Sequence, residues 1–291
     1  MKIFVFGLYE EDSGKTLLAL QLIRALKEVG TSIVPFKPMS GHNLWRQYEN
    51  LEKNVKMKKL FSYDLDRLRN ASGTSYPHEI LNPVCILTSP YNVKLYIEND
   101  ASPKSYLKES LYRNFMLGRI TQCSNESVSN LYLVNEQRIP FLLHHEDIIN
   151  SLLENADETK AISSEDEFLK YYQSELVENA IHSCYQYLAS KNENIIIEGF
   201  NNAILPWHGV LSSDVFLGAA PGYTLFFEKS QFINAVNTLM LYKNIYSLTS
   251  ESLLQLLHPV KIYKIPLRPL NFKWFESEIN KLVDDIISMG L

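Results

Sequence analysis

Hydrophobic and polar positions near the start of the chain fall into two clear patterns. The stretch Lys2–Gly7 is apolar, β-branched and aromatic, which is typical of a buried strand. From Leu17 to Val29, leucine, alanine and isoleucine recur at helical spacing, and Gly30 stands where a helix C-cap glycine would stand. A second strand is predicted over Ser32–Pro38, so this segment is a βαβ unit of a parallel sheet with a right-handed crossover.

The middle of the chain carries a weaker pattern. Gly41–Lys59 is polar and helical in character. Alternating residues around Leu95–Ile97 and over Asn130–Val134 predict two strands, and Arg113–Gln122 between them pairs with either. We therefore expect a small hairpin, followed by helices, as an insertion at about 93–190.

Strong patterns return after this insertion. Asn194–Gly199 is an apolar, β-branched strand that ends in a carboxylate and a glycine. The remaining predicted strands are Ser213–Gly218, Tyr223–Phe227 and Lys261–Ile265, and the remaining helices are Glu146–Ser190 (with a polar break at Asp157–Ser164), Ser230–Tyr242, Ser250–Leu257 and Trp274–Met289. The predicted fold is α/β: one domain over 1–291, built on a doubly wound, mostly parallel sheet that carries the insertion.

Composition excludes some classes of function. The chain has 291 residues, a net charge of −5 and 46% hydrophobic residues, so bulk electrostatics give no sign of a nucleic-acid partner. No apolar run approaches the ~20 residues of a spanning helix, and no signal peptide precedes the first strand, so we expect no membrane partner. Cys85, Cys123 and Cys184 are far apart, odd in number and without metal-ligand spacing. They favour buried free thiols in a reducing cytoplasm.

The clearest candidate for chemistry is Asp12-Ser13-Gly14-Lys15-Thr16, between the first strand and the first helix. Backbone amides and the positive dipole at a helix start attract a polyphosphate. Lys15 would reach the β- and γ-phosphates, and the Thr16 hydroxyl would bind Mg²⁺. The strict pattern G-x-x-x-x-G-K-[ST] is not met, because Tyr9 occupies its first glycine position and the loop is longer. A chance Gly-Lys-Thr at a helix start is the alternative.

A magnesium site needs one or two carboxylates. Glu198 is the best candidate, since a buried strand delivers it to the edge of the sheet where ligands bind; the alternative is a helix cap or a solvated strand end. Asp64 and Asp66 are candidates for the same shell, but both also fit a helix N-terminal turn with surface ion pairs. Lys37 is either a second catalytic cation on the γ-phosphate or a solvated strand-end lysine.

These segments together resemble dethiobiotin synthetase. The similarity rests on Gly14-Lys15-Thr16, Phe36-Lys37-Pro38-Met39-Ser40-Gly41, Ile197-Glu198-Gly199, Arg69-Asn70-Ala71-Ser72, Leu81-Asn82-Pro83-Val84 and Thr88-Ser89-Pro90. The similarity covers roughly residues 1–92 and 194–220. Dethiobiotin synthetase belongs to a wider P-loop class that also includes cobyrinate amidating enzymes and MinD/ParA ATPases. The sequences of Asp12–Thr16 and Ser40–Asn43 are still more similar to those of a set of predicted archaeal P-loop ATPases or GTPases.

The resemblance implies an ATP- and Mg²⁺-dependent enzyme. Lys15 and Lys37 would contact the phosphates, while Thr16, Asp64 and Glu198 would hold Mg²⁺, and Ser40 would lie near the substrate. The family joins CO₂ to a diamine, activates the carbamate by phosphoryl transfer and closes a ureido ring. Here the phosphate loop is one residue longer than in the family, Phe200-Asn201-Asn202 replaces a glycine-rich turn, and the insertion has no counterpart, so the nucleotide half of the site transfers better than the substrate half.

Three functions follow from these residues. The first is an ATP-dependent enzyme that activates a small carboxylate or carbamate, which the second lysine, Lys37, favours. The second is a switch-type ATPase or GTPase that acts through a protein partner bound by the insertion, but the MinD-like second lysine is missing from the start of the loop. The third is a binding protein with a vestigial site. The sequence leaves open whether the protein forms a homodimer. The loop Pro266–Pro269 could contact the nucleotide base, but nothing in it distinguishes ATP from GTP.

Overall fold

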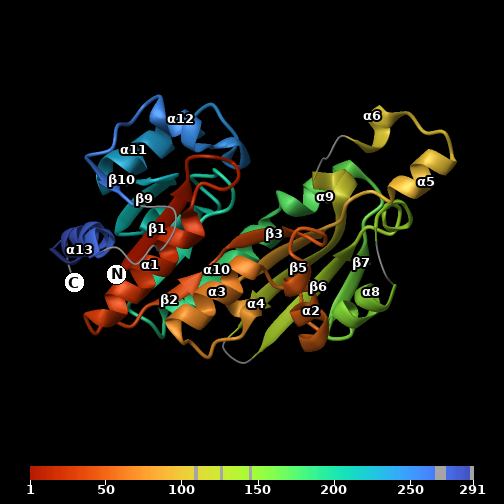
Figure 1. The fold of residues 1–291 in the computed structure, drawn as a ribbon, viewed down its shortest axis with the longest axis horizontal. Helices are drawn as coiled ribbons and strands as arrows, with labels where there is room; N and C mark the ends of the chain where they lie inside the picture. The colour runs from red at the N-terminus through yellow and green to blue at the C-terminus, as the bar shows by residue number, and fades with distance from the viewer. Residues whose placement is uncertain (108–110, 125–126, 144–145, 266–272, 289–291) are drawn as a thin grey trace. The chain divides into compact units, whose positions relative to one another are not determined.

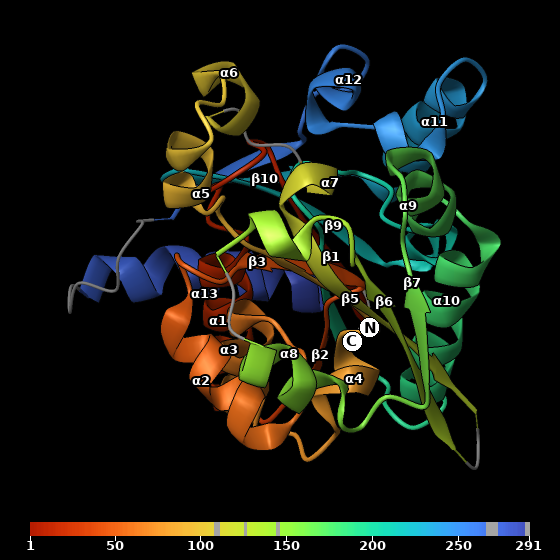
Figure 2. The same ribbon diagram turned by 90° about the vertical axis from the view of Figure 1, so that its right-hand side faces the viewer.

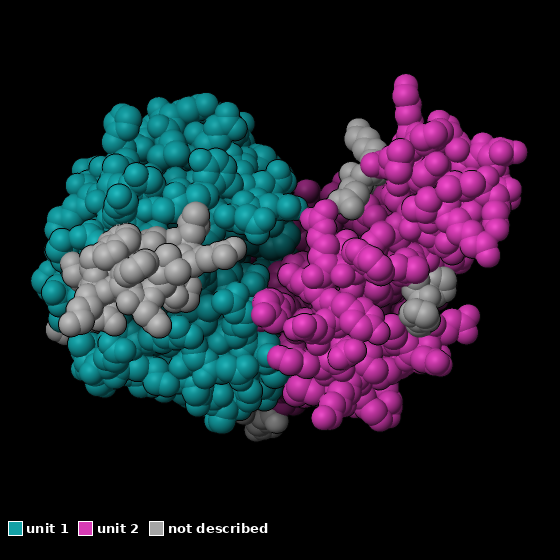
Figure 3. Space-filling view, viewed as in Figure 1, with its two compact units in different colours: residues 1–39, 64–81, 185–291 teal, residues 40–63, 82–184 magenta. Residues whose placement is uncertain are grey.

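The structure of the chain is a computed structural model that describes residues 1–107, 111–124, 127–143, 146–265 and 273–288. The chain divides into two compact units, coloured separately in Figure 3. Unit 1 comprises residues 1–39, 64–81 and 185–291, and unit 2 comprises residues 40–63 and 82–184. Unit 2 therefore interrupts the chain of unit 1 twice, and the predicted insertion at about 93–190 covers most of its second segment.

Unit 1 is built on a six-stranded mixed sheet with the order β11-β10-β9-β1-β8-β2 (Figure 1). Strand β1 pairs in parallel with β8 and β9, and β8 pairs in parallel with β2, whereas β10 is antiparallel to both of its neighbours. The strands are β1 (Lys2–Gly7), β2 (Val34–Phe36), β8 (Ile195–Glu198), β9 (Val215–Ala220), β10 (Tyr223–Phe227) and β11 (Lys261–Lys264). The predicted α/β class and the parallel β1–α1–β2 unit are confirmed.

Helices cover both faces of this sheet because β1 is apolar on both sides. Ile3 and Val5 belong to one core cluster with buried residues of α1 and α13. Phe4 and Phe6 face the other way, where Phe6 and Phe216 pack on Phe232 of α11 with ring centroids 5.7 and 4.2 Å away. The helical elements of unit 1 are α1 (Lys15–Glu28), α3 (Tyr63–Ser72), α4 (His78–Leu81), η2 (His208–Ser212), α11 (Lys229–Met240), η3 (Ile245–Ser247), α12 (Ser250–Leu254) and α13 (Lys273–Ser288).

The end of α1 follows the predicted glycine. Gly30 has φ +83°, its N–H donates to Lys27 O, and the Thr31 N–H donates to Leu26 O. These two bonds form a Schellman motif, which needs a left-handed residue at this position. The chain can therefore turn sharply from α1 into β2.

Unit 2 contains a five-stranded mixed sheet with the order β3-β4-β5-β6-β7. Strand β5 is antiparallel to β4 and β6, and β6 is parallel to β7. Its strands are β3 (Met39–Asn43), β4 (Val84–Thr88), β5 (Phe115–Cys123), β6 (Val128–Val134) and β7 (Glu158–Ala161). Its helical elements are α2 (Tyr48–Met57), α5 (Val93–Glu98), α6 (Pro103–Tyr106), α7 (Leu111–Asn114), η1 (Ile139–Phe141), α8 (Glu146–Leu153), α9 (Glu165–Tyr172) and α10 (Glu175–Ala189), the last of which runs on into unit 1.

A core cluster holds one part of unit 2 together. Leu51 of α2 packs with Ile149 and Leu152 of α8 against buried residues of β4, β5 and β6, and Figures 1 and 2 show α2 beside α8. The predicted strand over Asn130–Val134 is confirmed as part of β6, and Arg113–Gln122 overlaps β5. The predicted strand at Leu95–Ile97 is wrong, because these residues lie in the short helix α5, which has no buried residue. The polar break at Asp157–Ser164 contains strand β7, and Gly41–Lys59 opens in β3 before its helix begins.

The expectation of three free thiols is also wrong. Cys123 and Cys184 form a disulfide with a Cα–Cα distance of 4.9 Å, which ties the end of β5 to α10 within unit 2. Cys85 is a buried free thiol, as expected. An odd cysteine count does not reveal which pair the fold brings together. Among the described residues, no helix is both long and apolar enough to cross a membrane.

Candidate functional site

The loop between β1 and α1 is anchored at both ends. Leu8 N–H donates to Ala219 O at 2.9 Å, which fixes the loop beside β9. At the other end, Gly14 has φ +87° and its carbonyl accepts from Leu18 N–H, so it starts α1 in a conformation that favours glycine. Gly7 allows a close approach, since a Cβ there would lie 2.7 Å from the backbone oxygen of Asn201 as well as 2.5 Å from Ser13 Oγ.

Charged and hydroxyl groups from four segments converge beside this loop. Thr16 Oγ1 donates to Glu198 Oε1 at 2.7 Å, and Lys37 Nζ donates to the same oxygen at 2.6 Å. Asp64 lies at the start of α3 with its carboxylate 3.7 Å from Lys37 Nζ. Lys15 Nζ donates to Ser13 Oγ at 3.1 Å. The predicted residues Ser13, Lys15, Thr16, Lys37, Asp64 and Glu198 therefore lie in one cluster of unit 1.

Sheet topology explains this convergence. Strands β1, β8 and β2 are parallel neighbours, so their carboxyl ends share one edge of the sheet. Glu198 is the last residue of β8, and Lys37 directly follows β2. The chain leaves β1 at the same edge and returns as α1, whose first two residues are Lys15 and Thr16.

The electrostatics of the cluster centre on Lys15. Burial and, to a lesser extent, the positive charge of Lys37 lower the pKa of Lys15 to about 8, although Glu198, Asp64 and Asp12 act in the opposite direction. Asp12 is exposed on the loop, and its φ of +50° is a left-handed value. An anion that brings negative charge next to Lys15 would stabilise its protonated form.

Glu198 has one oxygen to spare. It is 1% exposed, and while Oε1 accepts from Thr16 and Lys37, Oε2 is buried without a hydrogen-bond partner among the described residues. A buried carboxylate oxygen left in this state is costly unless a ligand satisfies it. The Thr16 hydroxyl beside it and Asp64, which is 36% exposed, complete a set of oxygen donors that suits Mg²⁺.

No group of three or more His, Cys, Asp or Glu side chains that could hold a metal ion occurs in the part of the chain that the structure describes. Such a group is typical of zinc and of the larger calcium shells. Mg²⁺ usually takes one or two carboxylates, and water and phosphate oxygens fill its other positions. The donors in unit 1 therefore fit Mg²⁺ bound together with a phosphate, and they offer no dedicated cage for another metal.

The two candidate acids of α3, Asp64 and Asp66, have different partners. Asp66 is buried and pairs with His78 at 3.1 Å, and burial lowers the pKa of that histidine. Residues two apart on a helix point about 200° apart, so Asp64 and Asp66 cannot both face Lys37. The position of Asp64 makes it the acid of α3 that joins the cluster.

Ser40 belongs to unit 2, where it is 1% exposed and its Oγ donates to Asn82 Oδ1 at 2.6 Å. Its place near a substrate stays a prediction. The predicted contact of Pro266–Pro269 with a base lies outside the described residues.

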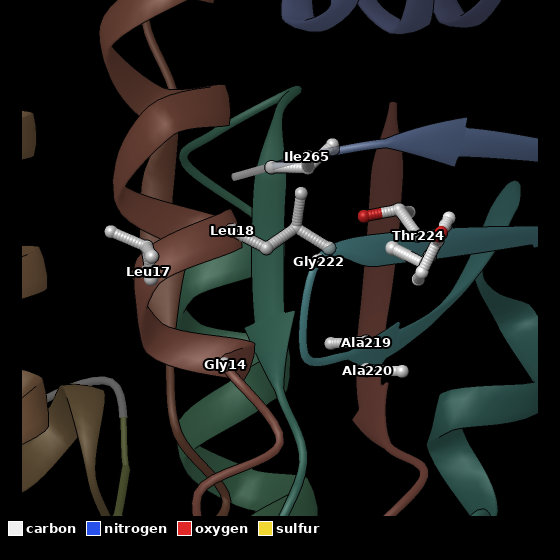
Figure 4. Close-up of a pocket in the computed structure, with 9 residues that line it drawn as sticks. Gly14, Leu17, Leu18, Ala219, Ala220, Gly222, Thr224 and Ile265 are labelled. Carbon is white, nitrogen blue, oxygen red and sulfur yellow. The ribbon is translucent and has the colours of Figure 1, made fainter. Parts of the chain in front are cut away.

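A small hollow that the sequence patterns missed lies next to the end of the β1–α1 loop. It has room for about one water molecule and lies between the start of α1 and the β9–β10 turn, with Gly14, Leu18, Gly222, Thr224 and Ile265 among its lining residues (Figure 4). Gly222, with φ +81°, makes the tight turn that shapes one side. The lining residues come from segments far apart in the chain, so no local motif predicts this hollow.

Comparisons with protein-family models, with curated proteins and with solved structures return no match to this chain. The resemblance to dethiobiotin synthetase therefore rests on the quoted motifs alone.

Proposed function

We propose that unit 1 is a P-loop nucleotide-binding domain that binds a nucleoside triphosphate, with ATP the expected one, together with Mg²⁺. The observation that carries this proposal is the convergence of Lys15, Thr16, Lys37 and Glu198 at one edge of the sheet. Buried lysines beside a helix start form an anion site, and the spare oxygen of Glu198 is suited to a cation. A triphosphate with Mg²⁺ supplies both charges at once.

Each residue then has a defined role. The amides from Ser13 to Thr16 and the ammonium group of Lys15 would bind the phosphates. Thr16, Glu198 and Asp64 would supply the oxygen ligands and the outer shell of Mg²⁺. When the γ-phosphate leaves, Lys37 would turn from Glu198 toward the growing negative charge, which is the role of a catalytic cation in phosphoryl transfer. Bound Mg²⁺ would neutralise the phosphates as a Lewis acid.

The reaction class proposed is phosphoryl transfer from ATP to a small carboxylate or carbamate, as in dethiobiotin synthetase. It is supported by the second buried lysine, since nucleotide binding alone does not require Lys37.

Calorimetric titration with ATP, GTP and CTP, each with and without Mg²⁺, tests this function directly. We expect Lys15→Ala to weaken nucleotide binding by at least 100-fold, because it removes the buried cation. Arg24→Ala is the matched control, since Arg24 is an exposed cation on the same helix. Equal affinity of Lys15→Ala and the unaltered chain would overturn the proposal.

Product analysis then separates the reaction classes. ATP turnover that depends on an added dicarboxylate or diamine supports the acid-activating enzyme. Turnover that responds only to a protein partner supports the switch-type ATPase or GTPase instead.

A further inference from the structure

Ser250 lies far from the phosphate loop in sequence but contacts it in unit 1. It is the first residue of α12 and is fully buried. Its Oγ donates a hydrogen bond of 2.9 Å to Leu8 O, at the start of the loop. Leu8 N–H donates to Ala219 O at the same distance, so both polar backbone groups of Leu8 are held.

The backbone of Ser250 is attached to the segment that follows Glu198. Ser250 N–H donates to Asn202 O at 2.9 Å, and Ile204 N–H donates to Leu248 O at 3.1 Å. Between these bonds, Ala203 and Thr249 form an isolated antiparallel bridge. Residues 202–204 and 248–250 thus form a short ladder, and Ser250 stands at the end of it that meets the phosphate loop.

The segment after Glu198 also presses on the loop directly. A Cβ on Gly7 would lie 2.7 Å from Asn201 O, and Asn201 itself has a left-handed φ of +47°. Gly199 N–H donates to Val5 O at 2.8 Å, which fixes the other end of this turn. Three segments therefore meet at Gly7 and Leu8: the phosphate loop, the turn after Glu198 and the start of α12.

We propose that Ser250 is a positioning residue for the phosphate loop, and that it acts through Leu8 O to hold the loop in register with Glu198. The loop from Gly7 to Gly14 is longer than the strict motif, so its first half needs an anchor that the motif itself does not provide. The hydroxyl of Ser250 supplies this anchor because its backbone is already tied to the turn after Glu198. The position of the loop amides matters, since small displacements of the groups that contact a ligand weaken its binding.

This inference rests on the proposed function for its effect on nucleotide, but its first test does not. Hydrogen exchange of the nucleotide-free chain reports on the loop itself. In Ser250→Ala, we expect amides in residues 8–14 to exchange about tenfold faster, because a buried hydrogen bond is lost. Ser250→Thr keeps the hydroxyl and should restore slow exchange. Unchanged exchange of residues 8–14 in Ser250→Ala would overturn the inference.

Ser252→Ala is the matched control. Ser252 lies on the same helix, is 4% exposed, and its Oγ accepts from Lys243 Nζ at 2.6 Å rather than contacting the loop. It should leave exchange of residues 8–14 unchanged, and a loop effect equal to that of Ser250→Ala would show general destabilisation of α12 instead. If Ser250→Ala does not fold, Ser250→Cys carries the same test, because a thiol is a poor donor.

Nucleotide binding provides the second readout. We expect Ser250→Ala to raise the Kd and KM for MgATP about tenfold while kcat changes less than twofold, since the bond acts on binding geometry and not on the transferred group. If the unaltered chain binds no nucleotide, the proposed function fails while the exchange result still decides the role of Ser250. A loosened loop with unchanged MgATP affinity would overturn the positioning role.

Discussion

Each of the two units contains a buried positive charge, and they satisfy it in different ways. In unit 1, Lys37 shares one oxygen of Glu198 with Thr16, and the second oxygen of that carboxylate has no partner among the described residues. In unit 2, Arg119 is 1% exposed and donates to Leu60 O at 2.8 Å, to Asn82 O at 2.6 Å and to the Thr121 hydroxyl. Within the described part of the chain, no ion pair joins Arg119 to an acid.

This difference separates a site from a structural support. The three acceptors around Arg119 are carbonyl and hydroxyl oxygens of the surrounding strands and loops, so its guanidinium group is committed to holding the backbone. Lys37 and Glu198 are instead paired with each other by opposite charge, and under the proposed function each exchanges this partner for a phosphate or a metal ion. A buried charge with a replaceable partner is the better sign of a binding site.

The largest expected effect concerns the disulfide of unit 2. Its cysteines are 61 residues apart, so the bond should stabilise this unit by about 4 kcal/mol through the entropy of the unfolded chain. Reduction with dithiothreitol should therefore speed hydrogen exchange in β5, β6 and the first turns of α10. Exchange in β1 and β8 should change far less, because both strands belong to unit 1.

A Cys123→Ala/Cys184→Ala variant provides the control, since reductant should have no further effect on it. Equal loss of protection in both units would contradict the comparison and show that they unfold together. Mass spectrometry of the thiols would also test the proposed cytoplasmic location, because stable disulfides are rare in that compartment outside hyperthermophiles.

A somewhat smaller effect is expected when the ion pair of unit 1 is broken. Glu198→Gln leaves Lys37 buried beside a neutral group, which should lower the free energy of unfolding by about 3 kcal/mol in urea titrations. We expect this loss of unfolding free energy to fall at the low end of the range for broken buried ion pairs, because the Asp64 carboxylate remains 3.7 Å from Lys37 Nζ. Under the proposed function the variant should also require more Mg²⁺ for turnover, since a proposed metal ligand is lost.

Asp64→Asn is the matched comparison for this variant. Its side chain is 36% exposed, against 1% for Glu198, so water screens its interaction with Lys37. It should cost less than about 1 kcal/mol. Equal destabilisation by the two variants would show that Glu198 is not the principal partner of Lys37, and an unaltered Mg²⁺ titration of Glu198→Gln would remove this residue from the metal shell.

The two units also differ in how far their structure follows from sequence. Strands β1 and β8 are buried on both faces, so they read as continuous apolar runs that are hard to mistake. Because β2 is also parallel to β8, Glu198 and Lys37 lie at the same edge of the sheet. Neither the bond between Glu198 and Lys37 nor the separation of Asp64 from Asp66 was foreseen, because both depend on side-chain direction.

Unit 2 is harder to predict because several of its helices and strands are short and lack a clear hydrophobic pattern. Leu95–Ile97 is apolar but sits in a six-residue helix, where periodicity cannot separate helix from strand. Strand β7 is exposed along its whole length, and only its pairing with β6 defines it. The two cysteines of the disulfide, and the carbonyl acceptors Leu60 O and Asn82 O of Arg119, are distant in sequence from their partners, so no local pattern reveals them.

The smallest effect expected on the unaltered chain is a pH dependence confined to unit 1. With a pKa of about 8, Lys15 is mostly charged at pH 7 and mostly neutral at pH 9, and only the charged form attracts phosphate. Affinity for MgATP should therefore fall about tenfold between these pH values, which is about 1.4 kcal/mol. Calorimetry at pH 9 should also show that binding takes up a proton. Lys15→Arg keeps its charge throughout this range, so its affinity, although weaker, should be independent of pH. A fall of the same size in Lys15→Arg would assign the titration to the ligand or to another group.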